Sequence, residues 1–197
     1  MSKNDKRMPI EQARAVAEKL GSALSESGVR YEICGSLRRG TKPDVGDLDV
    51  VVSDLQKAAW VCERQLGGNV IMPKQKKNKP IRQGYADLPE GIRAGLYFAY
   101  PEEWGAMVLF LTGNHIFNIK MRANAKRQGL KLNQYGLWEN ENAIAGRDEQ
   151  QIFMALGMEY VEPKDREDSP WQRVPGPYNF KAKREAANEG SSETERA

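Results

Sequence analysis

Two neighbouring stretches, Cys34–Gly40 and Gly46–Val52, constrain this 197-residue chain more than any other part of its sequence. The first reads Cys-Gly-Ser-Leu-Arg-Arg-Gly and follows a short strand-like run, 29–34, so the chain is predicted to turn at Gly35 and Ser36. Backbone N–H groups at such a turn and a serine hydroxyl can point at an anion, and two arginines add fixed positive charge. The stretch therefore predicts a phosphate-binding loop.

The second stretch carries two carboxylates, Asp47 and Asp49, at the start of a run rich in β-branched residues that strands favour. Side chains at positions i and i+2 of a strand share one face, roughly 6.5 to 7 Å apart. Two carboxylates on one face repel unless a cation lies between them, and oxygen ligands suit Mg²⁺. The pair predicts a metal site beside the phosphate loop. The plainer alternative is a turn with an N-capping serine and two solvated acids.

Together the two stretches resemble the nucleotidyltransferase superfamily, whose signature is Gly-Ser, a spacer and Asp-x-Asp. Ser-x-Arg-Arg-Gly before Gly-Asp-x-Asp resembles the family X DNA polymerases, the polymerase β-like group. A separate segment further along the chain, Phe110–Ala123, is similar to the nucleotide-selection segment of that family, in which Thr-Gly leads into a helix reading Ile-Phe-Asn and Met-Arg. Two separated motifs in the right order are more specific than either one, and the resemblance covers roughly residues 29–166.

The resemblance implies transfer of dNMP from a dNTP to a DNA 3′-hydroxyl, in repair or replication, with two Mg²⁺ ions bridged by Asp47 and Asp49; Mn²⁺ can replace them. It places Ser36 and Arg39 on the β- and γ-phosphates. The residues that it assigns to the nucleotide are Gly35, Ser36, Arg39, Phe110 against the sugar, Gly113, His115 near the base, and Asn118 on the minor-groove edge of the base. On the same helix Ile116, Phe117 and Ile119 are expected to pack in the core.

The chain departs from the family pattern at Gly95. In family X polymerases the strand after a basic hairpin carries a third aspartate, which binds the catalytic metal and takes the proton of the attacking hydroxyl. Counting back from Thr112 and Gly113 places that carboxylate at Gly95, within a predicted strand over 92–100, where a glycine is unfavourable. We therefore expect impaired activity. The alternative is that a nearby acid substitutes, the candidates being Asp87, Glu90, Glu102 and Glu103.

Positive charge is concentrated although the net charge is only +3. Lys74–Lys79 and Lys120–Arg127 are strongly basic, which suits a polyanion. A primer-template or gapped DNA is the expected partner, and the residues assigned to it are Lys74, Lys76, Lys77, Lys79 and, by resemblance, Arg122 on the templating strand. The alternative for the lysine stretch is a solvated hairpin tip, because it has no apolar period.

With 40% hydrophobic residues the chain can bury one or two small cores. We predict an α/β fold: a nucleotidyltransferase palm of mixed sheet with flanking helices over 1–100, a small α+β thumb-like domain over 101–168, and a flexible tail over 169–197. The sequence has no apolar run of membrane length, no signal peptide and only two cysteines. We therefore predict a protein that is not secreted and is cytoplasmic, or associated with a nucleoid or a virus, and we expect a monomer. The start is expected to be too short for the lyase domain of larger family members.

Two other classes of function stay open. Gly95 favours a catalytically silent module that binds nucleotide or DNA. A transferase that modifies a small molecule, a tRNA or a protein is the other alternative, and the match over Asn118–Arg122 speaks against it because a base-reading helix is of little use there.

Overall fold

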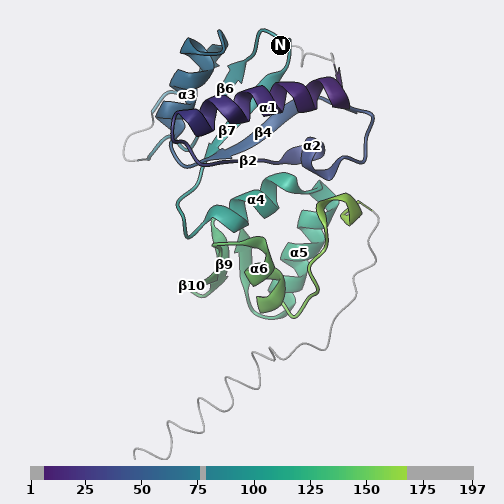
Figure 1. Ribbon diagram of the computed structural model, residues 1–197. Coiled ribbons are helices and arrows are strands. Elements are labelled where there is room, and N and C mark those ends of the chain that lie inside the picture. Colours follow the sequence, from purple (N-terminus) through teal and green to yellow (C-terminus); the bar gives the residue numbers. More distant parts are fainter. Residues whose placement is uncertain (1–6, 76–78, 168–197) are drawn as a thin grey trace, which may run out of the picture.

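The computed structural model describes residues 7–75 and 79–167 (Figure 1). Its first half is built on a five-stranded sheet in the order β2-β4-β7-β6-β5. The two central strands, β4 and β7, run parallel, and the other neighbours pair antiparallel. The strands are β2 (Tyr31–Ile33), β4 (Asp47–Val52), β5 (Asn69–Ile71), β6 (Gln83–Asp87) and β7 (Arg93–Phe98). The predicted mixed sheet within an α/β fold is confirmed.

Two helices cover one face of this sheet, α1 (Ile10–Glu26) and α3 (Leu55–Arg64). The Asp54 side chain begins α3 by accepting a hydrogen bond from the Lys57 backbone N–H at 2.9 Å, so an N-cap sets the direction of the chain after β4. Leu48, Val50 and Val52 of β4 pack in the core under these helices. Because strand side chains alternate, Asp47, Asp49 and Val51 lie on the opposite face.

The second half has its own core beneath α4 (Trp104–Thr112), α5 (His115–Arg127) and α6 (Glu149–Ala155). A three-stranded antiparallel sheet completes it, made of β8 (Lys131–Asn133), β9 (Gly136–Glu139) and β10 (Asn142–Ala145). The chain ends its described part in a 3₁₀ turn, η1 (Pro163–Asp165). The domain boundary near residue 100 stays a prediction, and the predicted tail over 169–197 lies outside the described residues.

A small third cluster joins the two halves. Val51 and Cys34 from the sheet pack against Trp104, Met107 and Val108 of α4, so α4 lies against the face that carries the two aspartates. The short helix α2 (Gly35–Arg39), which holds the predicted phosphate loop, contacts α4 and η1. A further two-stranded pairing, β1 (Met8–Pro9) with β3 (Asp44–Val45), ties the start of α1 to the loop before β4.

One packing prediction is wrong in part. Phe117 of α5 is buried in the second core as expected, but Ile116 and Ile119 are 61% and 48% exposed. The helix turns Phe117, Met121 and Ala125 inward, a set spaced by four residues, and a set displaced by one or two positions must face outward. The strand β6 was also missed, because its residues Gln83–Asp87 include glycine and polar side chains and lack an apolar alternation.

Both cysteines, Cys34 and Cys62, are buried and free. Burial raises the pKa of the Cys62 thiol to about 11, so this side chain is a small protonated hydrophobe. In the part of the chain that the structure describes, no helix combines the length and the apolar character needed to cross a bilayer.

Candidate active site

The phosphate loop and the acid pair meet at Gly35. This residue has φ +65°, and a Cβ built on it would collide with the Asp49 carboxylate, so position 35 needs a glycine both for its backbone conformation and for space. The neighbouring Cys34 N–H donates to the Asp49 carbonyl oxygen at 2.7 Å. The two predicted motifs therefore form one site, with a carboxylate pressed against the turn of the loop.

The electrostatics of this pair favour a bound cation. Burial, and then the like charge of Asp47, raise the pKa of Asp49 to about 6, while a hydrogen bond from Tyr97 and the charge of Arg39 lower it only in part. Burial and the neighbouring carboxylate therefore disfavour the ionised form of Asp49 in the protein alone, and a bound cation would favour it.

Gly95 lies beside this pair. In the parallel pairing of β4 with β7, Asp49 is the direct partner of Gly95, so a side chain at position 95 would stand next to the Asp49 carboxylate. Tyr97, two residues on and on the same face, fills that space: a Cβ on Gly95 would lie 2.9 Å from its Cε2 atom and 3.1 Å from its hydroxyl oxygen. The sequence does not single out Tyr97, since tyrosine is a common residue in strands and carries no functional signal there.

The four acids that could substitute for a carboxylate at position 95 have other surroundings. Asp87 pairs with Arg93 at 2.6 Å, Glu90 with Lys19 at 2.8 Å and Glu103 with Arg82 at 2.5 Å, while Glu102 is exposed in the turn before α4. Within the described ranges no three histidine, cysteine or acidic side chains come together as a metal-binding group. Three of the four acids already have basic partners, and substitution by any of the four stays a prediction.

The two arginines of the loop have different partners. Arg38 donates to the Thr112 hydroxyl at 2.8 Å and to Glu149 at 2.6 Å, so it joins α2 to α4 and α6. Arg39 is largely buried; its Nη1 donates to the Thr112 carbonyl oxygen at 2.5 Å and its Nε donates to Glu167 at 3.1 Å. Glu167 thus already offers a carboxylate to the arginine predicted to bind phosphates. Sequence spacing gave no sign of this contact, which joins residues 128 positions apart.

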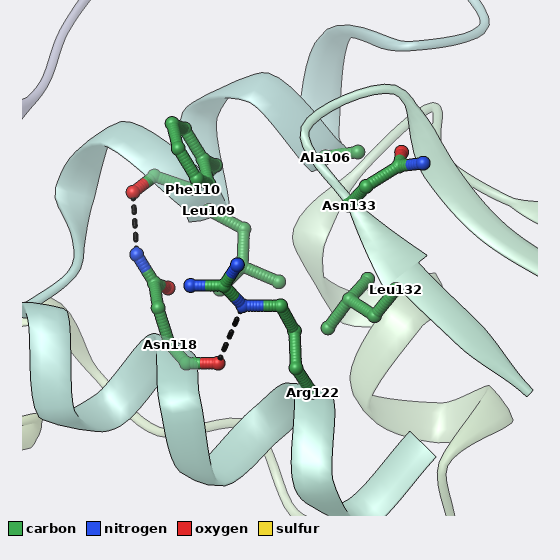
Figure 2. Close-up of a pocket in the computed structure, with 7 residues that line it drawn as sticks. All are labelled: Ala106, Leu109, Phe110, Asn118, Arg122, Leu132 and Asn133. Atoms are coloured by element: carbon green, nitrogen blue, oxygen red, sulfur yellow. Dashed lines mark hydrogen bonds between the residues drawn. The ribbon is translucent and has the colours of Figure 1, made fainter. Parts of the chain in front are cut away.

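Figure 2 shows a pocket that gathers the predicted nucleotide-selection residues Phe110, Asn118 and Arg122 from α4 and α5. The Asn118 amide donates to the Phe110 carbonyl oxygen at 2.7 Å, and the Arg122 Nε donates to the Asn118 carbonyl oxygen at 3.3 Å. The other lining residues are Ala106, Leu109, Leu132 and Asn133; the last two come from β8, and the sequence analysis did not assign them to the site.

Gly113 connects this pocket to the phosphate loop. Its φ is +65°, and its Cβ position lies 3.7 Å from Nη1 of Arg39 and 3.9 Å from the amide nitrogen of Asn118. The next residue, Asn114, begins α5 by accepting a hydrogen bond from the Phe117 N–H at 3.0 Å. His115 is exposed at the first position of that helix. Gly113 therefore lies between Arg39 of the phosphate loop and Asn118 of the pocket, at the junction of the two halves.

Comparison with known proteins agrees with this geometry. Residues 107–167 match the family described as DNA polymerase beta thumb. The chain is 26% identical to DNA polymerase lambda of Rattus norvegicus over 190 residues, which cover 82% of this chain and 33% of that protein. It is 37% identical over 73 residues to the repair DNA polymerase X of African swine fever virus (isolate Tick/South Africa/Pretoriuskop Pr4/1996), covering 36% of this chain and 42% of that protein. These matches support a relationship of the chain to the family X DNA polymerases.

The alignments span only part of these family members. DNA polymerase IV of Saccharomyces cerevisiae is 33% identical over 72 residues, which cover 36% of this chain and 12% of that protein. The chain spans less than half the length of each of the three relatives. The proteins that this chain resembles are named as DNA polymerases, and its own activity and partners are matters for proposal.

Family X polymerases use divalent metal ions, and the residues present fit one such ion. Asp47 and Asp49 lie on one face of β4, and the raised pKa of Asp49 indicates uncompensated negative charge there. Carboxylate oxygens suit Mg²⁺, which completes its shell with water and nucleotide phosphates. At position 95, where the resemblance predicts a third carboxylate, the chain has a glycine that is paired with Asp49 and covered by the ring of Tyr97.

The basic stretch is described only at its ends. Lys74 and Lys79 are exposed in the connection between β5 and β6. Lys76 and Lys77 lie outside the described residues. Contact of this stretch with DNA stays a prediction, as does contact of Arg122, whose side chain is exposed at the rim of the pocket.

Proposed function

We propose that this chain is a nucleotidyltransferase of the DNA polymerase X type, which adds dNMP from a dNTP to the 3′-hydroxyl of a DNA primer, in DNA repair or replication. The single observation that carries the proposal is the contact of Gly35 with the Asp49 carboxylate, which unites a phosphate loop and an acid pair in one site. The similarity to family X DNA polymerases supports it, because the relatives are named as DNA polymerases.

Each part of the site has a role in this reaction. Ser36 and Arg39 bind the β- and γ-phosphates, for which an arginine is well suited because its guanidinium can make two parallel hydrogen bonds. The pocket lined by Phe110 and Asn118 takes the sugar and base, and Arg122 reaches the templating strand. Asp47 and Asp49 would hold a Mg²⁺ ion, which when bound neutralises phosphate charge and orients the triphosphate for in-line attack.

The transfer forms a bond between the primer 3′-oxygen and the α-phosphorus and breaks the bond from that phosphorus to the bridging oxygen, so pyrophosphate leaves. The proton of the 3′-hydroxyl passes to water, because Gly95 offers no acceptor there. Loss of a positioned base costs typically 10²- to 10⁴-fold in rate. We therefore expect tight nucleotide binding with slow transfer.

Replacing Arg39 by alanine tests the phosphate site. We expect Arg39→Ala to weaken Mg·dNTP binding by about ten- to a hundredfold, since it removes a charge-assisted contact to the triphosphate. Glu167→Gln should strengthen binding, because Arg39 then no longer pairs with a carboxylate. Titration of a fluorescent dNTP against each variant measures the effect, with Arg64→Ala, an exposed arginine on α3, as the matched control.

Equal affinities for the wild type and Arg39→Ala would remove the phosphate loop from the proposal. Single-turnover extension of a one-nucleotide gapped primer, with protein in excess, then tests the transfer itself. Slow extension that needs Mg²⁺ or Mn²⁺ supports the polymerase. Nucleotide and DNA binding without any extension would instead make the chain a silent binding module.

The basic stretch has its own test. Changing Lys74, Lys76, Lys77 and Lys79 to alanine is expected to reduce the slope of log affinity for DNA against log salt concentration by roughly 2 to 4, because each neutralised phosphate contributes about 0.9. Lys57→Ala is the control, since this exposed lysine lies on α3, on the face of the sheet opposite the carboxylates. An unchanged slope would identify the stretch as a solvated loop.

A further inference from the structure

We propose that Tyr97 is a positioning residue for Asp49: its hydroxyl holds the carboxylate that binds the cation, and its ring occupies the place of a side chain at position 95, so that the site is built for one metal-bound nucleotide. This inference rests on the proposed function of the acid pair as a cation site. It goes beyond that function because it gives a task to a residue outside the family's sequence motifs.

The first observation is steric. Asp49 and Gly95 are direct partners in the parallel pairing of β4 with β7, and Tyr97 follows on the same face of β7. Three atoms of the Tyr97 phenol lie within 3.3 Å of the place where a Cβ on Gly95 would be: Cε2 at 2.9 Å, the hydroxyl oxygen at 3.1 Å and Cζ at 3.3 Å. The ring therefore folds back over the glycine, toward the carboxylate.

The second observation is the bond itself. The Tyr97 hydroxyl makes a side-chain hydrogen bond with Asp49. A tyrosine hydroxyl is protonated at neutral pH and an ionised carboxylate can only accept, so Tyr97 is the donor. A carboxylate has about four acceptor positions, so one donated hydrogen bond leaves room for a cation. Gly35, on the other side of this carboxylate, offers no side chain.

The third observation is that the ring is supported. Tyr97 packs against the cluster that joins the sheet to α4, which contains Val51 and Met107. A phenol held by packing can fix the orientation of a metal ligand, as outer hydrogen-bond partners do in metal sites. The glycine at position 95 follows from the same geometry, because even an alanine there would push the phenol away from Asp49.

The test measures metal binding rather than turnover. Mn²⁺ is titrated by electron paramagnetic resonance against the full chain with a non-hydrolysable dNTP analogue, for wild type and for Tyr97→Phe, which keeps the ring and removes only the hydroxyl. We expect about one Mn²⁺ per complex in the wild type and roughly tenfold weaker Mn²⁺ binding in Tyr97→Phe. Tyr85→Phe is the matched control, because this tyrosine pairs with Gly95 from the other neighbouring strand and its hydroxyl bonds Gln83 instead.

Two variants at position 95 test the steric part. Gly95→Ala is expected to weaken Mn²⁺ binding as much as Tyr97→Phe does, since it displaces the phenol and adds no metal ligand. Gly95→Asp combined with Tyr97→Ala should bind two Mn²⁺, because the new carboxylate then has free space beside Asp49. In Gly95→Asp alone the displaced phenol competes for that space, so the second Mn²⁺ should bind at least about tenfold more weakly than in the double variant. A Tyr97→Phe variant that binds Mn²⁺ as tightly as wild type, or equal affinity for the second Mn²⁺ in Gly95→Asp and in the double variant, overturns the inference. If wild type with the analogue binds no Mn²⁺ at all, the proposed function itself fails.

Discussion

Replacing Glu149 by alanine is expected to lower the free energy of unfolding by about 3 to 5 kcal/mol. Glu149 is only 7% exposed and faces two arginines, with Oε2 at 2.6 Å from Nη2 of Arg38 and Oε1 at 2.9 Å from Nη1 of Arg166. The side chains of these arginines are 20% and 0% exposed. Without Glu149, the buried Arg166 would lose its acidic partner and Arg38 would keep only Glu32, at 3.7 Å, which is far more costly than losing a surface pair.

The same residues join the two halves of the molecule. Arg38 comes from α2 beside the sheet, whereas Glu149 begins α6 and Arg166 follows η1. Arg166 also lies over the rings of Phe117, Phe153 and Tyr160 at 5.3 to 5.7 Å. The Oε1 contact to Arg166 is an ion pair whose geometry falls outside that of a hydrogen bond. Loss of Glu149 should therefore loosen both the second core and its attachment to the phosphate loop.

Urea unfolding at pH 7 measures this loss, with Glu141→Ala, an exposed acid in the turn between β9 and β10, as the control. Burial alone would raise the pKa of Glu149, but Arg38 and Arg166 more than offset burial, and its pKa is lowered. The carboxylate therefore contributes stability above its unfolded-state pKa of 4.5, and this contribution is lost as the pH falls below that value. Equal free energies of unfolding for the two variants would contradict the buried-charge argument.

Asp49→Asn is expected to act in the opposite direction and to stabilise the cation-free protein by about 1 to 3 kcal/mol at pH 8. Asp49 has a pKa raised from 3.8 to about 6, so ionising it in the folded state costs up to about 3 kcal/mol. Partial contact with solvent reduces that figure. Asparagine removes the charge and can still accept the hydrogen bond from Tyr97, yet it should abolish binding of the metal-bound nucleotide.

The sign of the pH dependence follows from the same shift. The folded state holds the Asp49 proton more tightly than the unfolded state, so wild-type stability should fall as the pH rises from about 4 to 6 and then level off. Thermal unfolding of both proteins across this range shows whether the difference grows with pH. Asp47→Asn is the matched variant, because Asp47 is exposed and its loss should weaken Mn²⁺ binding with little change in stability. A constant difference between wild type and Asp49→Asn across this range would contradict the raised pKa.

Short-range pattern was enough to predict several parts of this protein. The phosphate turn at Gly35 and the strand from Asp47 depend on residues within a few positions of one another, and the structure has them where local spacing predicts them. Counting along the chain also placed Gly95 at the position that proves to be the partner of Asp49. Backbone hydrogen bonds and alternation of side chains act over such distances, so the sequence displays them directly.

Tertiary structure alone decided the rest of the site. The ring of Tyr97 over Gly95, the Glu167 carboxylate on Arg39 and the contribution of Asn133 to the pocket depend on how elements pack, which no spacing reveals. The exposure of Ile116 and Ile119 has the same origin, because the direction in which a helix turns its apolar residues is set by the core that it meets. Glu149 and Arg38 are 111 positions apart in the sequence. Only the folded structure brings these two charges together, and each needs the other when it is removed from water.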